Sequence, residues 1–407
     1  MVEHVVVAGG GHAAAQLAAS LREEGFAGAV TLVGAEDDAP YQRPPLSKSY
    51  LSGADGEAAL PLRAARFYVE HEVELLTGRR VSAVDRSARR VYLADGHRLD
   101  YTHLVFATGA RNRDLPLPGN ELDGVLSLRG LEDARELRKR IADARTVAVV
   151  GAGFIGLEVA STARDLGTRV ALFEAADRPM SRAVSPPTAE WFAHAHRRNG
   201  VELRHGCGVA EIVGEGGAVH GVRTSDGTVH PADLVLVATG VRPNDELATQ
   251  AGLAVADGIL VDEYLSTADR SVSALGDCAR FPTRFAARPV RLESVQNATD
   301  QARCLAARLA GTPQPYTAVP WFWSHQGTDK LTIAGLSGDA DRFVTRGDPA
   351  DGKFSVWCFR GETLLAAEAV NSPGDHIAAR RLLGAAKTIT PDEAADGGFN
   401  LKAHSTA

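Results

Sequence analysis

The chain has 407 residues, which is enough for two or three domains at about 150 residues each. Its 44 lysines and arginines against 51 aspartates and glutamates give a net charge of −7, and 23% of the residues are charged while 44% are hydrophobic. These values exclude a largely disordered chain, a collagen-like chain, a small disulfide-framed secreted protein and a nucleic-acid binder that relies on overall charge.

The chain begins with a strand, a glycine turn, a helix and a second strand. A valine run is followed by three glycines, an alanine- and leucine-rich stretch with helical spacing, and another apolar run, at residues 5–7, 9–11, 13–21 and 30–33. The same order of features recurs later in the chain, at residues 147–150, 151–156, 157–166 and 169–173. We therefore predict two related nucleotide-binding folds in one chain.

The first glycine turn has the pattern Gly9-x-Gly11-x-x-Ala14, and Glu36 follows the second strand. Glycines in this pattern let a pyrophosphate approach the helix N-terminus, and the acid can accept hydrogen bonds from ribose hydroxyls. Because strand, helix and second strand all flank the pattern, we predict a dinucleotide site here. A glycine turn that only packs a helix on a sheet is the alternative.

Two apolar strands end in the same three small residues. They cover residues 104–109 and 234–240, and each follows a polar stretch with an Asp-Gly pair that favours a hairpin turn. Small residues at a strand end let another backbone or a cofactor come close. The residues concerned are Ala107, Thr108 and Gly109 in the first strand and Ala238, Thr239 and Gly240 in the second.

The second glycine turn, Gly151-x-Gly153-x-x-Gly156, matches the dinucleotide pattern fully, and Glu174 follows the next strand. An acid at this point accepts from both hydroxyls of an adenosine ribose and repels a 2′-phosphate, which favours NADH over NADPH. Two arginines close by, Arg178 and Arg182, could reverse that preference, although solvated surface charge is the simpler reading of both. Two cradles in one chain indicate FAD in the first and NADH in the second.

The remaining features concern the second half of the chain and its cysteines. Asp277 follows a predicted strand at residues 272–275 and is placed to meet a ribityl hydroxyl, although a Gly-Asp pair is more often just a turn. The tryptophan-rich last ninety residues predict a smaller α+β domain. The four cysteines form no C-x-x-C pair, so we expect no redox-active dithiol, no metal site and no iron–sulfur cluster. We see no signal peptide and no apolar stretch of about 18 residues, and we expect a cytoplasmic protein without membrane contact. The cysteines are Cys207, Cys278, Cys304 and Cys358.

Several motifs, in order along nearly the whole chain, resemble the oxygenase-coupled NADH-dependent ferredoxin reductases, the family of putidaredoxin reductase and rhodocoxin reductase type. The matching segments cover residues 41–48, 128–134, 153–160, 276–280, 293–298, 320–324 and 369–371. The resemblance implies a glutathione-reductase-like α/β fold with two Rossmann-like domains and a C-terminal α+β domain. It implies an FAD-binding domain at 1–110 and 234–315, an NAD-binding domain at 111–233 and a C-terminal interface domain at 316–407.

The resemblance also implies roles for individual residues. Lys48 would lie near the flavin and pair with Glu158, Pro45 would approach the isoalloxazine ring, and Trp323 would stack near the flavin and face the electron acceptor. A cation at that place favours the reduced, anionic flavin. A surface lysine beside a Ser47 helix cap and a core tryptophan are the alternatives. Further cofactor contacts would come from Ala13, Val81, Arg129, Ile155, Val295 and Gly240.

The chain departs from the family pattern at a few positions. His325 and Gln326 follow the Trp-Phe-Trp-Ser motif where the family usually has Asp first, which bears on the acceptor side and on partner choice. Ala35 stands where the usual acid would be and leaves Glu36 as its substitute. Ala14 replaces a third glycine, and the Ala-Thr-Gly at 238–240 replaces the more usual Gly-Ile-Gly.

Together these features predict an FAD enzyme that takes hydride from NADH and passes single electrons to a [2Fe–2S] ferredoxin, which supplies a cytochrome P450 or a ring-hydroxylating oxygenase. With a net charge of −7, an acidic ferredoxin would need a local basic patch. The resemblance gives Arg303 as the first candidate and Arg291, Arg308 and Lys330 as weaker ones, with solvated helix charges as the alternative for most of them. One alternative is a reductase of rubredoxin, oxygen or another small acceptor. The other is a non-enzymatic redox sensor of the apoptosis-inducing-factor type.

Overall fold

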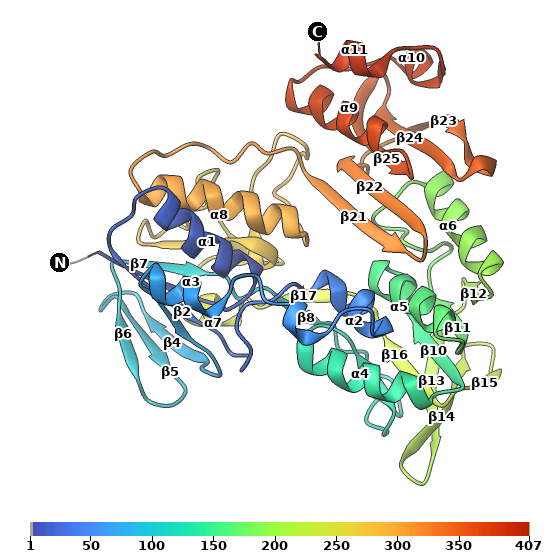
Figure 1. Cartoon of the computed structure of the whole chain (residues 1–407), viewed down its shortest axis with the longest axis horizontal. Coiled ribbons are helices and arrows are strands. Elements are labelled where there is room, and N and C mark those ends of the chain that lie inside the picture. Colours follow the sequence, from blue (N-terminus) through green and yellow to red (C-terminus); the bar gives the residue numbers. More distant parts are fainter. Residues whose placement is uncertain (1–2, 407) are drawn as a thin grey trace. The chain divides into compact units, whose positions relative to one another are not determined.

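The computed structural model describes residues 3–406, which fold into two compact units (Figure 1). The first unit comprises residues up to Gln42, Glu57–Arg111 and Val241–Ala318, and the second comprises Arg43–Gly56, Asn112–Gly240 and the residues from Val319 onward. Each unit contains a five-stranded parallel sheet, as the two strand–turn–helix–strand patterns predict.

The parallel sheet of the first unit has the strand order β19-β7-β1-β2-β3. Its central strand β1 is buried along almost its whole length, as expected for a valine run in a parallel sheet covered on both faces. The helix that follows β1, α1, packs against α8. The strands and helices are β1 (His4–Ala8), α1 (His12–Glu23), β2 (Ala29–Val33), α3 (Ala65–Glu70), β3 (Val73–Leu76), β7 (His103–Phe106), α7 (Glu246–Gln250), β19 (Val272–Ala274) and α8 (Val295–Leu309).

Smaller sheets complete the first unit. Three antiparallel strands, β4-β5-β6, include the hairpin predicted from Asp95 and Gly96, and two short strands form the pair β18-β20. Their bounds are β4 (Val81–Asp85), β5 (Arg90–Leu93), β6 (Arg98–Asp100), β18 (Ile259–Leu260) and β20 (Ala279–Arg280), and the chain also forms β8 (Ala110–Asn112) and β17 (Val241–Pro243).

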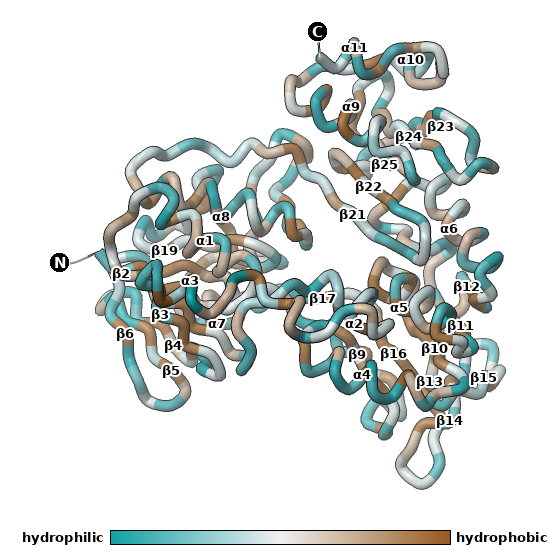
Figure 2. Tube along the Cα trace, in the orientation of Figure 1, coloured by the Kyte–Doolittle hydropathy of each residue, from teal (hydrophilic) through white to brown (hydrophobic). Residues whose placement is uncertain are grey.

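The parallel sheet of the second unit has the order β12-β11-β10-β16-β9. Its strands β10 and β16 are among the hydrophobic stretches of the trace, in keeping with their buried side chains (Figure 2). The bounds are α2 (Ser49–Ser52), β9 (Val125–Ser127), α4 (Leu131–Asp143), β10 (Thr146–Val150), α5 (Phe154–Asp165), β11 (Arg169–Glu174), α6 (Pro186–Arg198), β12 (Glu202–His205) and β16 (Leu234–Val237).

Two antiparallel sheets accompany it. The strands β13-β14-β15 contain the hairpin predicted from Asp226 and Gly227, and the C-terminal residues form the sheet β21-β22-β25-β24-β23, with α9 packed on β25 and β22. This confirms the predicted C-terminal α+β part. The bounds are β13 (Val209–Glu215), β14 (Ala218–Thr224), β15 (Val229–Pro231), β21 (Trp321–Gln326), β22 (Asp329–Gly335), β23 (Arg342–Asp348), β24 (Lys353–Arg360), β25 (Thr363–Val370), α9 (Pro373–Gly384), α10 (Pro391–Ala395) and α11 (Leu401–Thr406).

The structure corrects the predicted boundary at residue 234. Strand β16 pairs in parallel with β10 on one side and with β9 on the other, so it belongs to the sheet of the second unit and not with residues 241–318. The chain returns to the first unit after Gly240. Residues 43–56, expected within the 1–110 segment, also belong to the second unit. The assignment of FAD and NAD to separate domains stays a prediction.

Candidate functional site

The first glycine turn is shaped by close packing at one glycine and by open space at another. Gly9 has a φ of +143°, and a Cβ at this position would lie 2.1 Å from the carbonyl oxygen of Ala107. Gly11 instead has an ordinary extended backbone at the N-cap of α1, and a Cβ there would meet nothing within 4 Å. The fold therefore explains Gly9, whereas Gly11 leaves room for a ligand at the helix N-terminus.

Two further segments of the first unit meet this turn. Gly276, which precedes Asp277, lies against the start of α1, because a Cβ on Gly276 would be 3.2 Å from that of Ala13. Thr108 and Asn244 fix the end of β7, since the Thr108 hydroxyl donates to the Asn244 carbonyl at 2.6 Å and the Asn244 amide donates back at 2.8 Å. The structure thus brings together the cradle, the Ala-Thr-Gly strand end and the Gly-Asp turn.

Sequence reasoning missed His12, the first residue of α1. Its Nε2 lies 3.2 Å from the hydroxyl of Thr299, whereas its Nδ1 is buried without a hydrogen-bond partner among the described residues. Burial, with a smaller contribution from Arg63, lowers the pKa of His12, so the ring is neutral near pH 7. Its position directly after Gly11 was the available signal. On the neighbouring strand end, Glu36 accepts a hydrogen bond from the Tyr41 hydroxyl.

The second glycine turn has the same arrangement of close packing at one glycine and open space at another. Gly151 has a φ of +107°, and a Cβ on it would lie 2.5 Å from the carbonyl oxygen of Ala238, at the second Ala-Thr-Gly strand end. A Cβ on Gly156 would lie 2.1 Å from the carbonyl oxygen of Gly151, whereas one on Gly153 would meet nothing within 4 Å. The open position is again the N-cap of the following helix, α5.

Three side chains around this second turn bear on whether it can hold a ligand: a hydroxyl, an apolar side chain and a carboxylate. The Thr239 hydroxyl is buried without a partner among residues 3–406, and Ile155 in the first turn of α5 is 42% exposed although it is apolar. The carboxylate of Glu174 accepts from the backbone N–H groups of Ala152 at 2.7 Å and Ala176 at 2.9 Å. An orphaned hydroxyl, an uncovered apolar side chain and an acid beside an open helix N-terminus fit an adenosine dinucleotide.

The two arginines near Glu174 differ in their surroundings. Arg178 forms an ion pair with Asp177 at 3.3 Å, so a neighbouring carboxylate balances its positive charge. Arg182 is exposed, and its guanidinium lies 3.3 Å from the Cβ position of Gly240. Gly240 therefore faces a cation beside the cradle.

A buried ion pair lies in the second unit. The Nζ of Lys48 donates to Oε2 of Glu158 at 2.5 Å, and the Glu158 side chain is only 4% exposed. The Ser47 hydroxyl donates to the same oxygen at 2.6 Å, and the Ser324 hydroxyl donates to Oε1 at 2.6 Å. The predicted pairing of Lys48 with Glu158 is present. Ser47 and Ser324 were not predicted to take part, and only their places beside Lys48 and Trp323 could have signalled it.

On β21, Ser324 stands between the aromatic Trp323 and His325. Trp323 is half-buried and meets Phe322 edge to face, with ring centroids 6.2 Å apart. Phe322 in turn packs against Phe154, the first residue of α5, at 4.5 Å. His325 is exposed, and partial burial together with Lys330 and Lys48 lowers its pKa.

The other predicted site residues lie at element ends. Pro45 is in the short 3-10 turn Pro44–Ser47, Val81 begins β4, and Val295 begins α8 after the N-cap Ser294. Arg129 precedes α4, and its carbonyl accepts from Arg43 at 2.8 Å. These contacts fix the backbone at these positions and do not by themselves indicate a ligand.

The structure corrects two of the predicted docking cations. The Arg291 side chain is only 8% exposed and pairs with Glu293 at 2.6 Å and Asp257 at 3.4 Å. Arg308 reaches inward to the Ser273 hydroxyl at 2.5 Å, and with burial it lowers the pKa of His103 to about 3. Neither guanidinium is a free surface charge. Arg303 and Lys330 are exposed, as a docking role requires.

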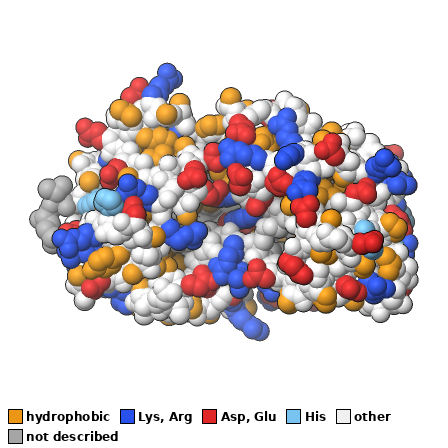
Figure 3. Space-filling model, turned by 90° about the horizontal axis from the view of Figure 1, so that it is seen from below, with side chains coloured by type: hydrophobic (Ala, Val, Ile, Leu, Met, Phe, Trp, Pro, Cys, Tyr) orange, Lys and Arg blue, Asp and Glu red, His pale blue; other side chains and the backbone are white. Residues whose placement is uncertain are grey.

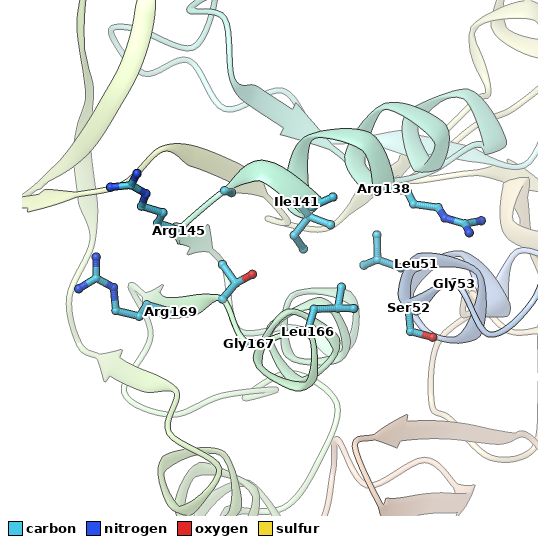
Figure 4. A pocket seen from close by; sticks show the side chains of 12 residues that line it. Leu51, Ser52, Gly53, Arg138, Ile141, Arg145, Leu166, Gly167 and Arg169 are labelled. Atoms are coloured by element: carbon cyan, nitrogen blue, oxygen red, sulfur yellow. The ribbon is translucent and has the colours of Figure 1, made fainter.

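One pocket of the second unit, of about 730 Å³, contains none of the predicted site residues (Figure 4). Arg145 and Arg169 lie on one side of it and Arg138 on the other, around Leu51, Ile141 and Leu166 (Figure 4). Helix α2, which follows Lys48, and the C-terminal end of α5 form part of its wall. No residue of either glycine turn lines this pocket.

Two negative findings concern residues 3–406. These residues contain no group of three or more metal-ligating side chains, and the cysteines at 207, 278, 304 and 358 are free thiols. No helix in the same range is long and apolar enough to cross a membrane.

The two cradles together fit two dinucleotides. Each presents a glycine with open space at a helix N-terminus, and each is followed in sequence by an acid after the next strand. A glycine that the packing does not require at such a place is explained by a bound pyrophosphate. The free N–H groups and the helix dipole would stabilise its charge. The first cradle would hold the flavin dinucleotide and the second the nicotinamide dinucleotide.

Comparison with known proteins agrees with this geometry. Residues 3–302 match the family model "Pyridine nucleotide-disulphide oxidoreductase", and residues 321–405 match "Reductase C-terminal". Rhodocoxin reductase from Rhodococcus erythropolis is 50% identical over 398 residues, which cover 98% of this chain and 93% of the relative.

Two solved structures are closely similar. The ferredoxin reductase for the CYP199A2 system from Rhodopseudomonas palustris has a TM-score of 0.97 and 46% identity, over 99% of this chain and 100% of its own. The putidaredoxin reductase of the covalent putidaredoxin reductase–putidaredoxin complex has a TM-score of 0.96 and 39% identity, over 100% and 99%. The chain therefore belongs to the pyridine nucleotide-disulphide oxidoreductase family.

Proposed function

We propose that this flavoprotein takes hydride from NADH and passes single electrons to a [2Fe–2S] ferredoxin, which in turn supplies a cytochrome P450 or a ring-hydroxylating oxygenase. The observation that carries this proposal is the combination of two dinucleotide cradles with four free, unpaired thiols. Without a dithiol, electrons from NADH have no internal disulfide to reduce. They leave one at a time to an external carrier.

Each part of the chain has a defined task in this proposal. Bound FAD supplies the conversion of a two-electron donor into a one-electron donor. The first cradle and Asp277 hold FAD, and the second cradle and Glu174 hold NADH. Lys48, fixed by Glu158, is the cation that favours the reduced cofactor, and Trp323 faces the acceptor. We propose the cytoplasm as the compartment, which the four free cysteines support.

The experiment that tests this function compares electron acceptors. The purified holoprotein should show a flavin band near about 450 nm that NADH bleaches under anaerobic conditions. A [2Fe–2S] ferredoxin should then reoxidise it much faster than rubredoxin or oxygen does. Equal or faster reoxidation by rubredoxin or oxygen would favour the reductase of another acceptor. Protein without bound flavin would contradict the enzyme.

For an acidic ferredoxin, we propose Arg303 on α8 as a docking cation. Its side chain is 62% exposed, and its ion pair with Asp300 at 3.5 Å is an exposed one that a partner carboxylate can replace. On the face shown in Figure 3, basic and acidic side chains are interspersed.

We expect Arg303→Glu to lower the kcat/KM for ferredoxin by about tenfold at low salt, because a rim charge acts mainly on the association rate. NADH-dependent reduction of ferricyanide should stay near normal, because this small oxidant needs no protein docking. Arg360→Glu, an exposed arginine on β24, serves as the charge-matched control. A parallel loss of both activities in Arg303→Glu would contradict a docking role.

A further inference from the structure

Glu158 is held by donors from two separate segments of the second unit. Lys48 and Ser47, both from the segment that precedes α2, donate to Oε2. Ser324 on β21 donates to Oε1 at 2.6 Å. Each carboxylate oxygen thus has a partner from a different segment, and the side chain has one defined orientation. A carboxylate that is 4% exposed needs such partners, because burying an unpaired charge is costly.

Ser324 is itself fixed by Gln326. Residues i and i+2 of a strand point to the same side, and both side chains are buried, at 1% and 3% exposure, whereas His325 between them is exposed. The Gln326 amide N–H donates to the Ser324 hydroxyl oxygen at 3.3 Å and to Met180 Sδ at 3.5 Å. Its Oε1 lies 2.8 Å from Nε2 of His196.

The three hydrogen bonds point in one direction, toward the carboxylate. His196 is buried and its pKa is lowered by burial, so its neutral ring donates from Nε2 to Gln326. Gln326 then donates to the Ser324 oxygen, which leaves the Ser324 proton to Glu158. Hydrogen bonds in such a chain polarise one another, and this chain ends on a negative charge.

The same glutamine also connects to the second cradle. Met180, which accepts from Gln326, has its backbone N–H bonded to the carbonyl oxygen of Ala152 at 2.9 Å. Ala152 lies between the first two glycines of the cradle. A continuous set of contacts therefore runs from the cradle through Gln326 and Ser324 to the Lys48–Glu158 pair.

We propose that Ser324 and Gln326 are positioning residues for the Lys48–Glu158 pair: Ser324 fixes the carboxylate, and Gln326 acts through Ser324. This inference rests on the proposed role of Lys48 beside the reduced cofactor. When the Ser324 hydroxyl is removed, Oε1 loses the one donor that it has among residues 3–406 and the carboxylate can rotate, which moves the Lys48 ammonium with it.

The test compares two buried serines. Ser324→Ala should slow flavin reduction by NADH about tenfold in anaerobic stopped-flow measurements, equivalent to about 1.4 kcal/mol. It should also make the flavin midpoint potential more negative by about 30 mV, which is a tenfold change for a two-electron couple. The dissociation constant of NAD⁺ should change less than about twofold. Ser161→Ala is the matched control, since Ser161 is 3% exposed on the same helix as Glu158.

Two more variants separate positioning from general stability. Ser324→Thr keeps the hydroxyl and should recover most of the rate and of the midpoint potential. Gln326→Met keeps the length and loses the amide, so it should give part of the effect alone and add nothing to Ser324→Ala. If Ser324→Ala matches Ser161→Ala in rate and potential, or if the Gln326 and Ser324 effects add fully, the positioning role is wrong.

These outcomes are distinct from a failure of the proposed function. A wild-type protein that is reduced by NADH but transfers no electrons to any ferredoxin would contradict the proposed function, and the serine comparison could still be read. If the Ser324→Ala protein does not fold, the rate and potential of Ser324→Thr and of Gln326→Met alone decide whether Ser324 and Gln326 position the pair or only stabilise the fold. A Gln326→Met protein with wild-type rate and potential would overturn the proposal.

Discussion

Gly9→Ala is expected to yield protein with little bound flavin and a lower melting temperature. The backbone at Gly9 has a φ of +143°, which an alanine adopts only at a cost of about 1–3 kcal/mol. The added methyl would also lie 2.1 Å from the Ala107 carbonyl oxygen and push the ends of β1 and β7 apart. We expect the Tm of the apoprotein to fall by roughly 5 °C or more. The ratio of absorbance near 450 nm to that at 280 nm measures the flavin.

Gly11→Ala distinguishes an effect on the stability of the fold from an effect on ligand binding. Its Cβ meets nothing within 4 Å and its φ is −95°, so the apoprotein should keep its Tm within about 1 °C. The methyl occupies the space at the helix N-terminus that we assign to the pyrophosphate, so the affinity for FAD should fall about tenfold or more. If FAD binds to Gly11→Ala as it does to the wild type, the pyrophosphate does not lie at this helix.

Lys48→Met is expected to lower the rate of flavin reduction by NADH on the order of a hundredfold. The variant removes the cation and leaves the buried Glu158 carboxylate with the two hydroxyl donors Ser47 and Ser324. Loss of one member of a buried pair costs up to about 3–5 kcal/mol, and the 25% exposure of Lys48 places this case at the lower end. The Tm should therefore fall together with the rate.

A double variant distinguishes the two effects. Lys48→Met with Glu158→Gln removes both charges, so we expect most of the lost stability to return while the rate stays low. The exposed Lys353, changed to Met, controls for a general loss of positive charge. A double variant that regains the rate along with the Tm would show that Lys48 serves the fold and has no role in electron transfer.

Short-range features of the sequence predicted much of the fold. The valine runs before each glycine turn became the central strands β1 and β10, and the Asp-Gly pairs at 95–96 and 226–227 became hairpins. The glycines at 9 and 151 were predicted from their spacing between a strand and a helix. In the structure each has a positive φ and another backbone close to its Cα, which leaves no room for a side chain. The runs, pairs and spacings that gave these predictions each lie within a few consecutive residues, so they can be read from the sequence.

Other features depended on which segments pack together. The membership of β16 in the second sheet is decided by hydrogen bonds to β10 and β9, which lie far from it in sequence. Arg291 and Arg308 look like solvated helix or loop charges in the sequence but pair inward with Glu293 and Ser273. Charge and spacing in the sequence do not show whether an arginine side chain points to solvent or into the fold.

The sequence alone predicted two nucleotide cradles, because glycine turns and strand periodicity are local properties. Its family motifs also pointed to Lys48 and Glu158 as partners. How that pair is held depends on the tertiary fold. Ser47 and Ser324 donate to one buried carboxylate, and Gln326 donates to Ser324, because separate segments fold around α5. A buried charge takes its partners from whatever packs against it, and no sequence spacing records that packing.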